Sequence, residues 1–492
     1  MTKRPPESSN GHRDTIEKPS DRDAPDRDAP DRDAAPGGDP SRRSTDGVEV
    51  PLDGPPFLGF LATQFLGAFN DNLFRQLLLL LAVPAAAAAA GNGDADLQGI
   101  ATILFGLPFV VFGGLAGFIG DRFPKKTIIV GSKVAEIAVM GLGMVAFLLS
   151  PRFGFQGLWV VLFLMGLQST FFGPGKYGIL PEILQRHQLA RANGLVLMTT
   201  FIAIIIGTAV AGPVKEFSVA PDAPRTEAAQ GLWVGSLLCI GIAVLGTLAS
   251  LLIPRSPIAD PGQQLRSEHL TIPRPMRKLL RLDRPLLLAL GASCVFWLIA
   301  GLAIQAVNSL GKTQLGLSDT KTSLMVSLIS IGIAGGGVSA GWLCRKISDG
   351  TVIALGTWGV ILFCGMLSVT IPGYGHALGF AGSMPVLILL GAAAAFFAIP
   401  IQVFLQARPP TTLKGRMIAV MNQANFLAIV LAGVFYIVID AVISAADWPR
   451  SAVFAAMAIL FLPVAIWFRL DESPPPEDLH EQVASEAGGG TD

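Results

Sequence analysis

The chain has 492 residues, of which 51% are hydrophobic and 15% are charged, and its formal net charge is +0. Soluble domains carry about 25% charged residues, so this composition indicates a membrane protein and argues against a soluble globular fold. A balanced charge provides no bulk positive field, so we expect no nucleic-acid partner.

The first 55 residues form a polar segment. It contains a near-repeat of Asp-Arg-Asp-Ala-Pro between Asp21 and Pro36, with few apolar residues and many alternating charges. Such a segment buries too little apolar surface to offset its ordering entropy, so we predict a disordered cytoplasmic tail over residues 1–55. The charged start also predicts no cleavable signal peptide.

Apolar runs long enough to cross a bilayer as helices follow this tail. We predict an all-α membrane protein with about twelve spans, near residues 57–83, 97–120, 126–150, 156–177, 193–212, 231–253, 286–308, 321–344, 351–371, 383–405, 416–440 and 450–469. A polar stretch separates the sixth span from the seventh. The predicted organisation is an N-terminal six-helix bundle (56–254), a cytoplasmic linker (255–285), a C-terminal six-helix bundle (286–470) and a cytoplasmic tail (471–492).

Lys and Arg residues are concentrated on one side of the predicted spans. That side carries Arg122, Lys125, Lys126, Arg186, Arg191, Arg255, Arg266, Arg274, Arg277, Lys278, Arg281, Arg284, Arg345, Lys346, Arg408, Lys414 and Arg416. The other side carries Arg152, Lys215, Arg225, Lys312, Lys321 and Arg450. This roughly threefold bias predicts that both termini and the linker are cytoplasmic.

The two halves contain a weak internal repeat. Phe171-Phe172 recurs as Phe396-Phe397, and the Phe-x-Ala-Ile strings that begin at 201 and 426 and the arginines at 191 and 416 share the same offset. A constant offset over two pairs of spans indicates that the halves arose by duplication, which predicts two pseudo-symmetric bundles.

The first predicted span contains an unusual polar step. Asn70, Asp71, Asn72 and Arg75 lie inside an otherwise apolar run. A carboxylate at mid-membrane costs roughly 2.5 kcal/mol or more to insert, so Asp71 must face protein or water rather than lipid. Asp71 and Arg75 share one helix face, which favours a substrate-binding role; mutual neutralisation is the alternative.

The loop after the second span reads Gly117-Phe-Ile-Gly-Asp121-Arg122-Phe-Pro-Lys125-Lys126. It resembles the signature loop of the major facilitator superfamily, with Pro124 where that family usually has Gly. We expect a gating latch, in which Gly117 admits a helix from the other half, Asp121 pairs across the interface, and the cations hold the loop at the anionic membrane surface. Arg416, the duplicate of Arg191, is assigned to the same gate. A generic basic turn is the alternative.

The fourth span ends in Phe171-Phe-Gly-Pro-Gly-Lys-Tyr-Gly-Ile-Leu, in which Pro174 and the glycines favour a break or kink. Together with Gln-Phe-Leu-x-Ala-Phe-x-Asp-Asn in the first span and Ala-Asn-Gly at 192–194, this string resembles the bacterial lysophospholipid transporter (LplT-type) family. It is also similar to the transporter half of fused transporter–acyltransferase (Aas-type) proteins. The resemblance extends from about residue 57 to 470.

The resemblance implies a secondary transporter that moves lysophospholipids to the inner leaflet of the bacterial inner membrane, where a separate acyltransferase would re-acylate them. It implies that Asp71 helps to bind the headgroup. The family tends to carry an Arg in the seventh span, where this chain has Ile304-Gln305. We expect Arg75 to supply the missing cation. Transport of another amphipathic molecule or drug is the alternative function.

Other polar residues lie inside the predicted spans, and some of them extend the candidate substrate site. Lys133 and Glu136 are spaced to pair with each other, and Lys176 is placed to reach the lipid phosphate zone. Any single amide is as consistent with helix–helix contact as with a ligand contact, and their concentration on the first, fourth, seventh, tenth and eleventh spans favours a cavity. The further candidates are Gln64, Gln168, Gln305, Gln402 and Asn422.

Catalytic and cofactor motifs are absent from the sequence. No His-x-x-x-x-Asp acyltransferase motif and no P-loop occurs, and the four cysteines lack metal-ligand spacing. We therefore expect no enzyme activity, no metal and no cofactor. The expected partners are the amphipathic substrate and membrane lipids, and we expect a monomer.

Overall fold

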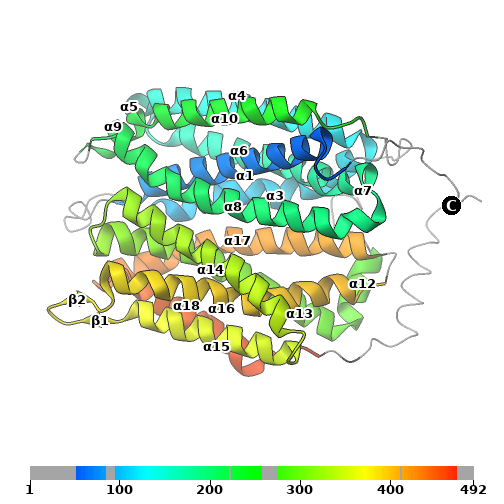
Figure 1. Ribbon diagram of the computed structural model, residues 1–492. Coiled ribbons are helices and arrows are strands. Elements are labelled where there is room, and N and C mark those ends of the chain that lie inside the picture. The colour runs from blue at the N-terminus through cyan, green and yellow to red at the C-terminus, as the bar shows by residue number, and fades with distance from the viewer. Residues whose placement is uncertain are drawn as a thin grey trace, which may run out of the picture. The chain divides into compact units, whose positions relative to one another are not determined.

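In the computed structural model, long helices run side by side between two ends of the fold (Figure 1). The structure describes residues 51–84, 95–220, 223–256, 272, 274–410, 413–471 and 473. The predicted tails at 1–55 and 471–492 lie almost entirely outside these residues, as does most of the linker between 257 and 273.

Within the described residues, the N-terminal half contributes six long helices and three short ones. The long helices are α1 (Pro55–Ala82), α3 (Gln98–Arg122), α4 (Lys125–Leu148), α6 (Gln156–Gly178), α8 (Arg186–Ser218) and α10 (Trp233–Leu251). The short helices are α5 (Ser150–Phe153), α7 (Leu180–Ile183) and α9 (Arg225–Gly231). Helix α6 continues through Pro174, so the predicted break does not occur there.

The C-terminal half repeats this arrangement after a short linker helix, α12 (Arg274–Leu282). Its long helices are α13 (Arg284–Ser309), α14 (Asp319–Leu343), α15 (Asp349–Ser368), α16 (Gly379–Ala407), α17 (Lys414–Ala445) and α18 (Ala452–Trp467). Helix α13 ends in a π-helical turn, Leu310–Gln314. A small antiparallel hairpin, β1 (Thr370–Ile371) and β2 (Gly375–His376), connects α15 to α16.

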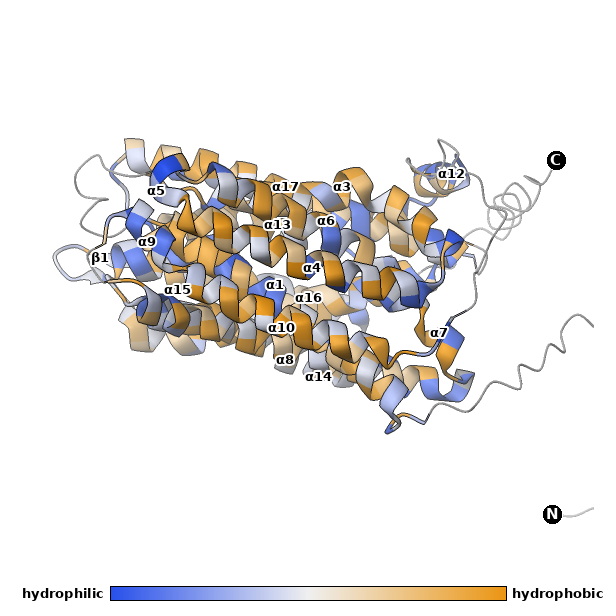
Figure 2. Cartoon of the chain, turned by 90° about the horizontal axis from the view of Figure 1, so that it is seen from above, coloured by the Kyte–Doolittle hydropathy of each residue, from blue (hydrophilic) through white to orange (hydrophobic). Residues whose placement is uncertain are grey.

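Ten of the described helices are long and apolar enough to cross a membrane, by length and composition. Helix α1 is 28 residues long but carries the polar step at 70–75, and α18 is apolar but has 16 residues. Together they match the predicted spans and confirm the all-α membrane fold. Hydrophobic residues dominate the length of the long helices, and the short helices α5 and α9 at one end are more hydrophilic (Figure 2).

Each half has its own buried apolar core. One cluster joins α12 to the helices from α13 to α18, while two clusters occupy the N-terminal half. Across the halves, α3 packs against α17 and α8 packs against α14. We call the end with α7 and α12 the basic end, because Arg122, Lys125 and Arg416 lie there, and the end with α5, α9 and the hairpin the opposite end (Figure 1).

Candidate functional site

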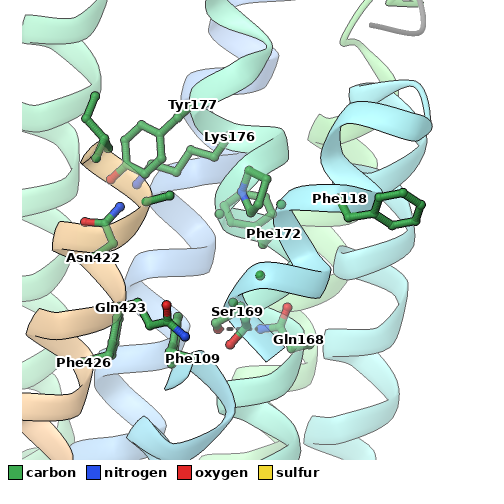
Figure 3. Close-up of a pocket in the computed structure, with 18 of the residues that line it drawn as sticks. Phe109, Phe118, Gln168, Ser169, Phe172, Lys176, Tyr177, Asn422, Gln423 and Phe426 are labelled. Carbon is green, nitrogen blue, oxygen red and sulfur yellow. Dashed lines mark hydrogen bonds between the residues drawn. The ribbon is translucent and has the colours of Figure 1, made fainter. Parts of the chain in front are cut away.

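A cavity of about 780 Å³ lies between the N-terminal helices and α17. Its walls come from α1, α3, α4, α6 and α17, and it extends from Asp71 in the middle of α1 to Asp121 and Arg416 at the basic end. Figure 3 shows Asn422 and Phe426 of α17 on one side of this space and Gln168, Ser169 and Phe172 of α6 on the other. The cavity therefore lies between the two halves of the fold.

Two stacked aromatic rings from opposite halves close the inner part of the cavity. The rings of Phe109 and Phe426 lie 3.8 Å apart at an interplanar angle of 3°. Beside them, the amide of Gln423 donates to the backbone carbonyl of Val110 at 3.0 Å. From these contacts toward the basic end, α3 and α17 separate, and a Cβ added at Gly117 would meet no atom within 4 Å.

Asp71 lines this cavity. The hydroxyl of Ser169 on α6 donates to Asp71 Oδ2 at 2.8 Å, and the amide of Gln168 donates to that hydroxyl at 3.1 Å. Asp71 Oδ1 has no hydrogen-bond partner among the described residues. This carboxylate lines the cavity and thus keeps one buried oxygen without a described hydrogen-bond partner.

The two candidate cations occupy different places. Lys176 lines the cavity, with its ammonium 5.0 Å from the ring of Tyr177. Arg75 is not among the lining residues; its guanidinium lies 5.0 Å from the ring of Phe105. Within the described part of the chain Arg75 forms no ion pair with Asp71, so mutual neutralisation does not explain the polar step.

A buried ion pair on α4 also borders the cavity. Lys133 and Glu136 pair with each other, as their spacing predicts, and each side chain is at most 2% exposed. Asn70 donates its amide to Glu136 Oε1 at 2.6 Å, which joins α1 to this pair. A Cβ at Gly67 would lie 2.9 Å from Lys133 Nζ, so the small residue makes room for the ammonium.

The other predicted substrate residues divide into two groups. Gln64, Gln168 and Asn422 line the cavity. Asn70 and Asn72 do not, and the amide of Asn72 donates to its own helix at Ala68. The remaining two that lie outside the lining are Gln305 and Gln402. Among the described lining residues the C-terminal half is represented by α17 and Ile272, and not by α13 or α16.

The predicted gating residues are also distributed over different environments. Gly117, Asp121 and Arg416 line the cavity at the basic end. The other three members make local contacts: Arg122 lies over the ring of Phe118, Lys126 donates to the carbonyl of Leu251, and Lys125 pairs with Glu182 at 2.5 Å. Lys125 is 5% exposed, so it is buried against α7 rather than held out toward a membrane surface.

At the opposite end, buried amides connect the two halves. Gln76 of α1 donates to Asn308 of α13 at 2.8 Å, and Asn308 donates in turn to Gln98 of α3 at 3.0 Å. Tyr436 of α17 donates to Asp96 at 2.8 Å. These polar groups stay buried only while the halves remain in contact, so they form a seal.

An ion pair between the halves, Lys215 with Asp319, and a close backbone contact add to this seal. Asp319, at the start of α14, pairs with Lys215 of α8 at 3.1 Å and with Lys312 at 2.5 Å. A Cβ added at Gly433 of α17 would lie 2.5 Å from the carbonyl oxygen of Gly99 on α3. The fold is therefore closed at the opposite end and open at the basic end.

Asp96 is a carboxyl of the seal that lies before the start of α3. Burial raises the pKa of Asp96 to about 6, and the nearby charge of Asp440 acts in the same direction. Hydrogen bonds from Gln98 and Tyr436 oppose this rise. The pKa of Asp96 therefore lies closer to neutrality than that of a solvent-exposed aspartate.

Several residues of the site escaped the sequence analysis. Ser169 and the aromatic pair of Phe109 and Phe426 occur in apolar helices whose patterns do not distinguish cavity from core. Lys133 and Glu136 were expected to pair, but their place beside the cavity was not. Among the described residues, no group of three or more His, Cys, Asp or Glu side chains is placed to hold a metal.

Comparison with known proteins gives the following relatives. The family model of the Major Facilitator Superfamily matches residues 60–433. The chain is 28% identical over 383 residues to the lysophospholipid transporter LplT of Enterobacter sp. (strain 638), covering 75% of this chain and 85% of that protein. It is 28% identical over 407 residues to the lysophospholipid transporter LplT of Yersinia pestis (strain Pestoides F), which covers 80% of this chain and 89% of that protein.

Solved structures of transporters share the fold. The inward open xylose transporter XylE from E. coli aligns with a TM-score of 0.58 and 14% identity, over 87% of this chain and 99% of that one. A POT family transporter in complex with 5-aminolevulinic acid aligns with a TM-score of 0.60 and 13% identity, over 86% and 98%. The chain is a multi-pass membrane transporter that belongs to the major facilitator superfamily and, within it, resembles the LplT-type lysophospholipid transporters.

Proposed function

We propose that this protein moves lysophospholipids across the bacterial inner membrane by alternating access. The observation that carries the proposal is Asp71, a mid-membrane carboxylate that lines a cavity between the two halves and keeps one buried oxygen without a described hydrogen-bond partner. The named relatives, which are lysophospholipid transporters, support the substrate class. The cavity volume of about 780 Å³ lies within the range of small-molecule sites.

The cavity combines groups for both ends of a lysophospholipid. Asp71 accepts hydrogen bonds from an ammonium or hydroxyl headgroup, and Lys176 attracts the phosphate. The rings of Phe109, Phe118 and Phe426 provide apolar wall for the single acyl chain. Lys176 takes the cationic role that the sequence analysis gave to Arg75, because Lys176 lines the cavity and Arg75 does not.

The proposed orientation follows the charge bias. With the basic end and both termini in the cytoplasm, the open cavity faces inward, and the sealed end faces the periplasm. Transport then requires the seal to open while the loop around Asp121 and Arg416 closes. Delivery to the inner leaflet would supply a separate acyltransferase. The proposed functional unit is a monomer.

Substitution of Asp71 tests the headgroup role. We expect Asp71→Asn to insert normally and to lose most uptake of labelled lysophosphatidylethanolamine in spheroplasts, because the neutral amide cannot hold an ammonium group by charge. Asp349→Asn, in the first turn of α15, is the matched control and should retain uptake. Undiminished uptake by Asp71→Asn at equal membrane abundance would refute the role.

Another amphipathic substrate is the alternative. It is favoured by Gln305, which stands near the position where the lysophospholipid transporters tend to carry an Arg and lies outside the cavity. Competition on one proteoliposome preparation separates the two functions. Unlabelled lysophospholipids should displace the labelled substrate better than cationic amphipathic drugs if the first proposal holds, and worse if the alternative holds.

A further inference from the structure

Helix α12, which precedes the C-terminal bundle, has two chemically opposite faces. Its cations follow the i, i+3, i+4, i+7 spacing of a single helix face. They are Arg274, Arg277, Lys278 and Arg281. The apolar residues Met276, Leu279 and Leu280 lie on the other face.

The apolar face anchors the helix to the protein. Met276 and Leu279 are fully buried in the core cluster of the C-terminal bundle. At the end of α12, Asp283 accepts a hydrogen bond from the backbone N–H of Leu286 at 3.1 Å and pairs with Arg408 of the α16 C-terminus at 2.7 Å. These contacts hold α12 in one orientation, so its cations point away from the core.

The cationic face borders a groove of about 460 Å³, and the described residues that line it are the four cations and Leu282. The helix itself carries no acidic residue. The guanidinium groups of Arg274, Arg277 and Arg281 stand at helical spacings where like charges repel one another, and an anion in the groove would relieve that repulsion. Arginine guanidinium groups offer paired N–H donors that match phosphate oxygens.

The groove also adjoins apolar surface. Leu282 is 54% exposed, and Leu287 and Leu288 near the start of α13 are 46% and 59% exposed. Because α13 is a membrane span, this boundary between cations and exposed leucines lies where lipid headgroups meet acyl chains. An occupant therefore needs both a negative phosphate and an attached hydrocarbon, which a free phosphate lacks.

We propose that the cationic face of α12 binds the phosphate headgroup of an anionic phospholipid in the leaflet at the basic end. Arg277 and Arg281 hold the phosphate, and Leu282 contacts the glycerol and upper acyl chain. Ile272, two residues before α12, lines the central cavity, so the bound lipid lies near the cavity mouth. This site is separate from Asp71 and Lys176 and does not depend on which substrate is transported.

Binding of defined lipids to the purified full chain tests the inference. Native mass spectrometry would compare phosphatidylglycerol with phosphatidylcholine of the same acyl composition. The two guanidinium groups that hold the phosphate contribute about fivefold each to affinity, so Arg277→Gln/Arg281→Gln should weaken phosphatidylglycerol binding about 25-fold. Arg345→Gln/Lys346→Gln, two exposed cations that follow α14, is the matched control and should bind as the wild type does.

A second variant separates charge from folding. Arg277→Lys/Arg281→Lys keeps both charges and should retain most of the binding. The inference is overturned if Arg277→Gln/Arg281→Gln binds phosphatidylglycerol like the wild type, or if the control pair weakens binding equally. Displacement of the lipid by an equal concentration of inorganic phosphate would also overturn it, because the site would then take free anions.

Discussion

At the scale of single residues, the cost of buried charge explains the contacts around Lys133. An isolated ammonium in the membrane interior is expensive, and the pairing with Glu136 together with the amide of Asn70 offsets that cost. The pair is therefore a structural unit of the cavity wall. It stabilises the fold only when both members are present.

A double-mutant cycle measures this dependence. Lys133→Met leaves Glu136 buried without its cation and should lower the free energy of unfolding by about 3 kcal/mol. Lys133→Met/Glu136→Leu replaces both charges with apolar groups and should recover most of the loss. Reversible unfolding in mixed micelles provides the measurement. If the double variant loses as much free energy of unfolding as Lys133→Met and Glu136→Leu lose together, the two side chains do not act as a pair.

Asp96 predicts a pH dependence of the seal. Its pKa is raised to about 6 while it is buried, and an exposed aspartate has a pKa near 3.8, so the closed state binds the proton more tightly than an open state that exposes Asp96. Closure of the opposite end should therefore increase as the pH falls from 7 toward 5. Below about 3.8 both states are protonated, and no further change is expected.

Spin labels on exposed positions of the two halves report this closure. Phe217 on α8 and Tyr374 in the hairpin are 86% and 89% exposed, and cysteines there can carry labels in a background without the native cysteines. The fraction of short distances should rise at low pH in the parent and stay constant in Asp96→Asn. An equal pH response in Asp96→Asn would assign the effect to another group.

At the scale of elements, α3 and α17 form a contact that changes along their length. Near the opposite end their backbones touch at Gly99 and Gly433, while nearer the basic end Gly113 and Gly117 face open space. Glycine at 99 and 433 permits the close approach, since any side chain there would collide with the facing carbonyl. The same two helices thus provide both the seal and one entrance wall.

A bulky side chain at this contact should hold the opposite end open. Gly433→Leu places carbon atoms where Gly99 now lies, so the labels at 217 and 374 should shift to longer distances. Gly241→Ala on α10 is the control, because a Cβ there meets no atom within 4 Å. A Gly433→Leu distribution that matches the parent would contradict the close packing of α3 on α17.

At the scale of the whole molecule, the sequence predicts the topology well because hydrophobic length and the 225-residue offset depend on chain order alone. It also predicts that Asp71 must avoid lipid. The sequence could not predict that Gln305 and Gln402 lie outside the cavity lining. Knowing which helix carries a residue does not show how deep in the membrane it lies or which way its side chain faces. The sequence also does not indicate whether the chain adopts the inward-open or the outward-open state, because the same sequence must fold into both.

The central claim is that the sealed end must open for a lysophospholipid to cross. Thr320 donates its backbone N–H to Glu216 at 2.7 Å across α8 and α14, so Glu216→Cys/Thr320→Cys can be joined by a reducible thiol cross-linker. In proteoliposomes without the native cysteines, translocation of labelled lysophosphatidylethanolamine should stop on cross-linking and return on reduction. Translocation that continues at the parent rate in the cross-linked protein would contradict the account.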